Sequence, residues 1–121
     1  MKIRKITIKE YVLKEEREEA KPSVFFIKNL NGAEDAQVQQ LLFGGNHYKG
    51  IVESAKLGIT NWKNIYDEND KIAKFSKANL LELPTEVLYE IGTEVLKISS
   101  DKYKDLLESV EVEEDPLEEA K

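Results

Sequence analysis

Two stretches near the start of the chain alternate apolar and polar residues in the manner of β-strands. The segment Ile3–Leu13 has this alternation over much of its length, which is typical of a half-buried strand. A second strand is predicted at Ser23–Lys28. Its apolar run is short, and we expect at least one of its faces to lie against a core. The charged run Glu15–Glu19 between them favours a solvated loop or a helical turn.

Apolar residues at helical spacing follow the second strand and predict two amphipathic helices. Asn31 is placed to cap the first helix, because its side-chain oxygen can accept a hydrogen bond from an amide of the first turn. We expect this helix to run to about Phe43, where Gly44-Gly45 ends it. Gly58 is placed to end the second helix in the left-handed conformation that glycine adopts at little cost. The apolar stripe of the second helix comprises Tyr48, Ile51, Val52, Ala55 and Ile59.

The last third of the chain predicts one long helix and two shorter helical pieces. Pro84 suits the first turn of the long helix, since proline lacks an amide that the turn would leave unpaired. Ser76 is placed to cap a helical turn at Lys77–Glu82, and Asp101–Val110 also predicts a helix. The apolar stripe of the long helix, the clearest in the chain, comprises Val87, Leu88, Ile91, Val95 and Ile98.

A β-hairpin is expected before these last helices. Trp62–Tyr66 and Ile72–Phe75 contain aromatic and β-branched residues and flank the polar loop Asp67-Glu68-Asn69-Asp70. We therefore predict an α+β fold, in which a small antiparallel sheet of the N-terminal strands plus this hairpin packs against three to five helices. The length of 121 residues fits one domain, which we assign to residues 1–110. The glutamate-rich residues 111–121 predict an acidic, flexible C-terminal tail.

Composition and charge narrow the classes of partner. No apolar run approaches the ~20 residues that a membrane-spanning helix needs. The basic opening is followed by no apolar segment, so we expect no secretory signal and a cytoplasmic protein. The net charge is −6 and the basic residues are interspersed with acids, which disfavours nucleic-acid binding. A local basic patch stays open at Lys2, Arg4, Lys5 and Lys9.

Catalysis and zinc binding find little support among the residue types present. The chain has no cysteine, and its one histidine is His47. A Ser–His–carboxylate triad would therefore need His47, and a zinc site would lack the nitrogen and sulfur ligands it requires. A surface or capping role is the favoured interpretation of this histidine.

Two further motifs resemble ligand loops only in part. The loop that starts at Asp67 resembles the opening of a calcium loop, but Lys71 occupies an expected ligand position and the required glycine is missing. Gly44-Gly45 lacks the Gly-Lys-Ser/Thr ending of a phosphate-binding loop. We predict a protein that is not an enzyme and that has no catalytic residue, metal or cofactor. Its function would be to bind another protein.

The single tryptophan, Trp62, has two interpretations. Buried aromatic residues anchor many interfaces, so it could contact a partner. Tryptophan is also highly buried on average, and a place in the core at the base of the expected hairpin is the favoured interpretation.

Three stretches follow one another in an order and spacing more specific than any of them alone. They are a strand, a Leu-x-Gly turn and a helix start in Val24–Glu34; Leu-Gly-Ile-x-x-Trp-x-Asn in Leu57–Asn64; and Phe-Ser-x-x-Asn followed by Leu-Pro-x-Glu-Val in Phe75–Val87. Through these stretches the protein resembles, over about Val24–Ile98 and so most of the chain, the small phage tail assembly proteins, also called tail assembly chaperones. Asn61 departs from the pattern, because the family often has glycine there, and this leaves the local backbone turn open.

The resemblance implies a non-catalytic assembly protein made in the cytoplasm of an infected host. It would bind the tape measure protein and shield its long apolar helical surfaces until tail-tube subunits, a further candidate partner, polymerise around it. Amphipathic helices can form a groove that accepts such a helix. No partner-binding residue is carried over, because the matched motifs are typical of turns, caps and core. The binding surface and the oligomeric state stay open.

Two other function classes stay open as well. One is a structural component of the virion, such as a tail-completion or connector protein. The other is a protein-binding regulator whose acidic surface, above all Glu111–Glu119, mimics nucleic acid.

Overall fold

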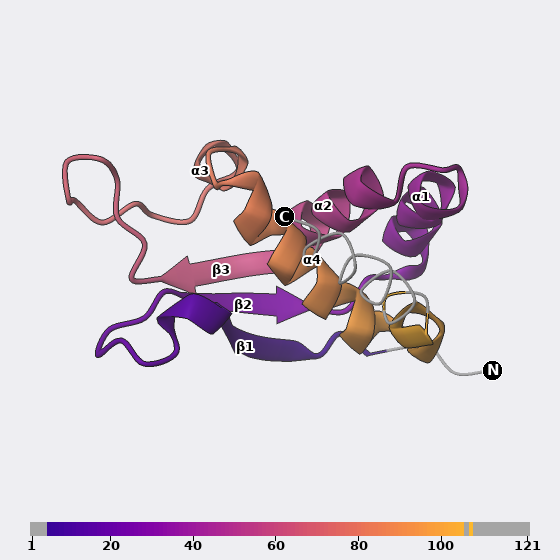
Figure 1. Cartoon of the computed structure of the whole chain (residues 1–121), viewed down its shortest axis with the longest axis horizontal. Helices are drawn as coiled ribbons and strands as arrows, with labels where there is room; N and C mark the ends of the chain where they lie inside the picture. The colour runs from indigo at the N-terminus through magenta and orange to yellow at the C-terminus, as the bar shows by residue number, and fades with distance from the viewer. Residues whose placement is uncertain (1–4, 106, 108–121) are drawn as a thin grey trace, which may run out of the picture.

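The computed structural model describes residues 5–105 and 107, and these form the α+β fold that the sequence predicts (Figure 1). The acidic segment 111–121 lies outside the described residues. The elements in chain order are β1 (Ile8–Val12), the 3-10 helix η1 (Lys14–Glu16), β2 (Val24–Lys28), α1 (Gly32–Phe43), α2 (His47–Gly58), β3 (Ile59–Lys63), α3 (Lys77–Leu81) and α4 (Thr85–Ser99). Residues 101–105 are helical again, as expected for the start of the last predicted helix.

The sheet is antiparallel, with β2 between β1 and β3. Phe25 at the centre of β2 lies opposite Tyr11 on one side and Trp62 on the other. The register shifts between Phe26 and Ile27 where β2 meets β3. Because side chains alternate between the two faces of a strand, these contacts place Phe25 and Trp62 on the same face as Ile27.

The predicted hairpin forms only beside its loop, where the Ala73 amide donates to the Ile65 carbonyl and the Asp67 amide donates to the Lys71 carbonyl. The strand that contains Trp62 begins at Ile59, directly after α2, and pairs with the distant β2. Of the expected hairpin only a single bridge between Tyr66 and Ile72 forms. The Trp62 ring is buried between Phe25 of β2 and Phe75 of the segment after the loop.

Helix starts follow the predicted caps. Asn31 and Glu34 form a reciprocal capping box at the start of α1, and the Ser76 hydroxyl accepts a hydrogen bond from the Asn79 amide at the start of α3. Pro84 occupies the position just before α4. After α1 the chain turns through Gly45, whose φ of +88° is one that residues with a side chain rarely adopt.

Helices α2 and α4 pack at very short range, and two glycines allow it. A Cβ atom at Gly92 would lie 1.9 Å from the carbonyl oxygen of Ile51, and one at Gly58 would lie 2.6 Å from both methyl carbons of Val95. The expectation that Gly58 ends α2 in a left-handed conformation is wrong, since Gly45 has the only positive φ among the described glycines. Gly58 is needed for the approach of α4 instead.

Helix α4 covers one face of the sheet and completes the core. Figure 1 shows α4 passing across the strands. Its Glu94 and Glu90 reach the β1 side chains Lys9 and Tyr11 on that face. The core combines β2, the helices and the segment after α4, and its most deeply buried large side chains include Tyr103, Phe25, Ile27, Leu30, Leu42, Ile51, Ile91 and Leu96.

Candidate protein-binding surface

The residues considered for catalysis or metal binding do not converge. His47 is the exposed first residue of α2. The Asp67 carboxylate accepts hydrogen bonds from the amides of Asn69 and Lys71, at 2.8 and 3.0 Å, and so organises its own loop. Among residues 5–105 and 107, no three histidine or acidic side chains are grouped so that they could hold a metal ion.

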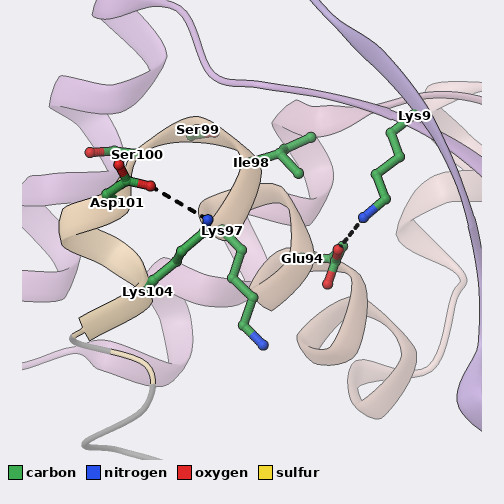
Figure 2. Close-up of a pocket in the computed structure, with 8 residues that line it drawn as sticks. All are labelled: Lys9, Glu94, Lys97, Ile98, Ser99, Ser100, Asp101 and Lys104. Carbon is green, nitrogen blue, oxygen red and sulfur yellow. Dashed lines mark hydrogen bonds and ion pairs between the residues drawn. The ribbon is translucent and has the colours of Figure 1, made fainter.

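A pocket lies where the end of α4 meets the following helical turn and β1, and three lysines line it (Figure 2). Figure 2 shows Lys9 reaching from β1 toward Glu94, and Lys104 directed at Asp101. The two ion pairs measure 2.5 and 3.4 Å. Such pairs at a protein surface contribute little stability, and each brings an acid beside a base. The charges of Lys9 and Lys104 are thus paired within this polar pocket. Lys2 and Arg4 of the basic patch considered from the sequence lie outside the described residues.

The serines of the same pocket serve the fold. The Ser99 hydroxyl donates a 2.6 Å hydrogen bond to the Val95 carbonyl and accepts one of 2.9 Å from the Leu30 amide. Ser99 is 4% exposed, and this contact joins α4 to the turn between β2 and α1. The pocket therefore brings together groups that hold the structure and assembles no nucleophile with a base.

Two buried tyrosine hydroxyls also join separate parts of the chain. The Tyr11 hydroxyl donates a 2.6 Å hydrogen bond to the Glu90 carboxylate, which also accepts a hydrogen bond from the Lys14 amide. The Tyr103 hydroxyl donates a hydrogen bond to Asp35 on α1. Burial, followed by the hydrogen bond to the neighbouring carboxylate, raises the pKa of each of these tyrosines above its usual value. Both hydroxyls stay protonated at neutral pH and act as structural donors.

Trp62 belongs to the core, as favoured from the sequence. It is 6% exposed, its indole N–H donates a 2.8 Å hydrogen bond to the Ala73 carbonyl, and its ring meets those of Phe25 and Phe75 edge to face. A groove runs beside it between β3 and residues 72–75. Ile72 on this groove is 71% exposed. The tryptophan therefore supports the groove from within and does not itself reach into solvent.

The most exposed aromatic surface on the helical layer lies at the turn between α1 and α2. Phe43, the last residue of α1, is 63% exposed, and Tyr48 in the first turn of α2 is 52% exposed. Tyr48 stacks on Tyr89 of α4, with ring centroids 5.0 Å apart and an angle of 23° between the planes. Phe43 precedes Tyr48 by five residues, across the turn that joins α1 to α2. We call Phe43, Tyr48 and Tyr89 the aromatic corner.

The aromatic corner was not found from the sequence, which assigned no partner-binding residue. Tyr48 fits the apolar stripe of α2, and this pattern places it with the core residues Ile51 and Ala55. The contact with Tyr89 depends on how α2 crosses α4, which no local pattern shows. The available signal was the pair of aromatic residues on either side of the Gly44-Gly45 turn.

The motif residues behind the family resemblance have structural roles. The Asn29 side chain binds the Thr7 amide and the Lys5 carbonyl, and the Asn79 side chain donates to the Lys74 carbonyl. Asn61 lies in β3 with its side-chain oxygen on the Trp62 amide, and its backbone needs no glycine. These side chains stabilise the local structure, and their contacts indicate no binding site.

Comparison with protein-family models, with curated proteins and with solved structures finds no match to this chain. Within the described part of the chain, no helix combines the length and the apolar character needed to cross a bilayer.

Proposed function

We propose that the protein is a non-catalytic phage tail assembly chaperone, which binds the tape measure protein in the host cytoplasm before the tail tube polymerises. The support from the sequence is the likeness of Val24–Glu34, Leu57–Asn64 and Phe75–Val87 to that family, in its order and spacing. The support from the structure is the aromatic corner. The proposal assigns no catalytic residue, metal or cofactor.

The aromatic corner is the observation that carries the proposal. Phenylalanine and tyrosine provide large contact areas, and tyrosine adds a hydroxyl that can hydrogen-bond at the rim. Exposed aromatic residues that gather in one place mark interaction surfaces more often than scattered ones do. Phe43 ends α1, and Tyr48 in the first turn of α2 stacks on Tyr89 of α4. The apolar stripe of a tape measure helix would pack across these three helices.

Capture of tape measure fragments encoded by the same genome tests the proposal. We expect the wild-type protein to retain a helical fragment and Tyr48→Ala to bind it at least tenfold more weakly, since truncating an anchor residue often costs that much affinity. Tyr66→Ala is the matched control, because Tyr66 is 51% exposed and lies in the loop after β3. Failure of the wild-type protein to retain any fragment overturns the proposed function.

Analysis of purified particles separates a chaperone from a structural virion component. A chaperone leaves the tail as the tube forms, so mass spectrometry should find it at far less than one copy per tail component. Stoichiometric presence in the particle would identify a tail-completion or connector protein instead.

The distribution of charge favours one second candidate, an acidic protein-binding regulator. Residues 108–121 hold seven acidic residues and one lysine, whereas residues 1–107 hold seventeen of each sign. The whole net charge of −6 therefore lies in the last fourteen residues. Replacing Glu111, Glu113 and Glu114 with glutamine should abolish competition with nucleic acid if this candidate is right, and should leave capture of the tape measure fragment unchanged if the chaperone is right.

A further inference from the structure

One edge of the sheet has open backbone groups, and its register shows which residues carry them. The Trp62 amide donates to its neighbour's side chain, Asn61 Oδ1, so the pair Phe25–Trp62 does not exchange backbone hydrogen bonds. The amide and carbonyl of Phe25 therefore face β1, and those of Tyr11 opposite face β2. Because backbone groups along a strand point alternately to its two sides, those of Ile8, Glu10 and Val12 in β1 point away from β2.

Two side-chain hydrogen bonds agree with this assignment. Arg17 Nε donates 3.3 Å to the Val12 carbonyl, which must therefore point away from β2. Thr7 is an odd-numbered residue like Tyr11, so its amide should point toward β2. It does, and it donates a 2.8 Å hydrogen bond to Asn29 Oδ1 just after β2. The amides and carbonyls of Ile8 and Glu10 form an open hydrogen-bonding edge, beyond which the described chain has no further strand.

The opposite edge, β3, is better protected. Asn61 occupies the Trp62 amide, and Asn64 ends the strand one residue after Lys63 with a φ of 61°. β1 by contrast carries exposed β-branched side chains, Ile8 at 53% and Ile6 just before it at 62%. A free edge with such residues is a template for another strand.

We propose that β1 pairs antiparallel with β1 of a second copy of this chain across a two-fold axis, which makes one continuous sheet of six strands. Ile8 lies on the axis opposite its own copy. Each Ile6 then lies opposite Glu10 of the other copy and each Thr7 opposite Lys9. A two-fold axis of this kind gives both copies the same contacts, so the interface is closed. This inference is independent of the proposed chaperone function.

Charge selects this register among those whose axis lies at Thr7 or within β1. Like charges directly opposite each other destabilise a sheet. An axis at Lys9 would place the two Lys9 side chains opposite each other, and an axis at Glu10 would do so for the two Glu10 side chains. An axis at Thr7 would place Lys5 of each copy opposite Lys9 of the other. An axis nearer the end of β1 would need the Val12 carbonyl, which Arg17 occupies. The axis at Ile8 sets no like charges opposite each other.

The part of the chain that contains β1 carries no net charge that would oppose this contact. Residues 1–107 are neutral overall, since they hold equal numbers of acidic and basic residues. At the axis, the isoleucines of both copies meet on the sheet face opposite α4, where Ile6 and Ile8 are exposed in one copy. Lys9 lies on the other face, where Glu94 already binds it.

Single cysteines test the register, because the natural chain has none. Two residues that face each other across an antiparallel pair have α-carbons ~5.5 Å apart, within the range that a disulfide spans. We expect Ile8→Cys to form a covalent dimer under mild oxidation, and Glu10→Cys to form at least tenfold less. Equal cross-linking of the two variants contradicts the register.

Sedimentation of the full chain tests the dimer itself. The wild-type protein should sediment with twice the mass of one chain. Ile8→Lys, which places two lysines on the axis, should be monomeric, whereas Ile72→Lys, at another exposed isoleucine, should stay dimeric. Circular dichroism shows that each variant is folded. A wild-type monomer, or a dimeric Ile8→Lys, overturns the proposal, and neither result bears on capture of the tape measure fragment.

Discussion

Gly92 lies against the carbonyl group of Ile51, so closely that a methyl group on Gly92 would sit 1.9 Å from the carbonyl oxygen and 2.8 Å from the carbonyl carbon. Backbone cannot move aside as the end of a flexible side chain can. This contact fixes the distance between α2 and α4, and through it the place of Tyr48 beside Tyr89. The helical layer and the aromatic corner therefore depend on the same glycine.

Replacing Gly92 with alanine should destabilise the protein by about 3 kcal/mol or more, because overpacking a tight contact costs 1–3 kcal/mol even where side chains can adjust. Urea unfolding followed by circular dichroism measures this change. Gly32→Ala is the control, since nothing lies within 4 Å of a Cβ atom there and Gly32 begins α1. That variant should be as stable as the wild type or slightly more stable. Equal stability of the two variants would contradict the close contact.

Ser99→Ala should lower the free energy of unfolding by about 1–3 kcal/mol, because it leaves the buried Leu30 amide without its acceptor. Ser54→Ala provides the comparison. Ser54 is also buried, but its hydroxyl donates only to the Gly50 carbonyl within its own helix, so removing it should cost less. The difference between the two free energies, measured by chemical unfolding, isolates the contact between α4 and the turn after β2. A larger loss for Ser54→Ala would sink this interpretation.

Alkaline pH should destabilise the protein through Tyr11 and Tyr103. The folded state raises the pKa of both hydroxyls, so it holds their protons more tightly than the unfolded chain does. The resulting stability is fully present below the unfolded pKa of about 10 and is lost as pH rises beyond it. Unfolding midpoints measured across this range should fall less steeply for Tyr11→Phe than for the wild type. An identical slope would mean that the Tyr11 hydroxyl ionises as freely in the folded protein as in the unfolded chain.

Asn29→Ala should release the chain ahead of β1. Asn29 is 5% exposed, and its side chain is the acceptor for the Thr7 amide and a donor to the Lys5 carbonyl. Hydrogen exchange at the Thr7 amide should become about tenfold faster or more. In Asn31→Ala the exchange should instead become faster at the Glu34 amide, which donates a hydrogen bond to the Asn31 side chain, and should stay unchanged at Thr7. Faster exchange at Thr7 in both variants would indicate general loosening.

Features that depend on neighbouring residues were predictable from the sequence. The capping roles of Asn31 and Ser76 follow from the chemistry of a helix start, and the turn at Gly45 follows from glycine's freedom at positive φ. The stripe that includes Ile91 and Val95 identified α4 as a long helix with one apolar face. All of these rest on contacts within a few residues of chain.

Features that depend on distant contacts were not predictable. β3 pairs with β2, more than thirty residues earlier, so the local hairpin pattern around Asp67 misled. Gly58 stands where a helix-ending glycine is typical in the sequence, but in the structure its lack of a side chain leaves room for Val95 of α4. Tyr48 matches a core stripe, yet it is half exposed and stacks on Tyr89 of α4. The candidate surface arises from these crossings, so it became visible only in three dimensions.

The burial of Trp62 gives the protein an optical reporter at one known place. It is the only tryptophan in the chain, and its indole ring lies between Phe25 of the sheet and Phe75 of the segment that leads into α3. Its N–H is bound to the Ala73 carbonyl, so separation of that segment from β3 would expose the ring to water. Fluorescence excited selectively at this tryptophan therefore reports on the contact between β3 and the segment before α3, separately from the tyrosines of the aromatic corner and of β1.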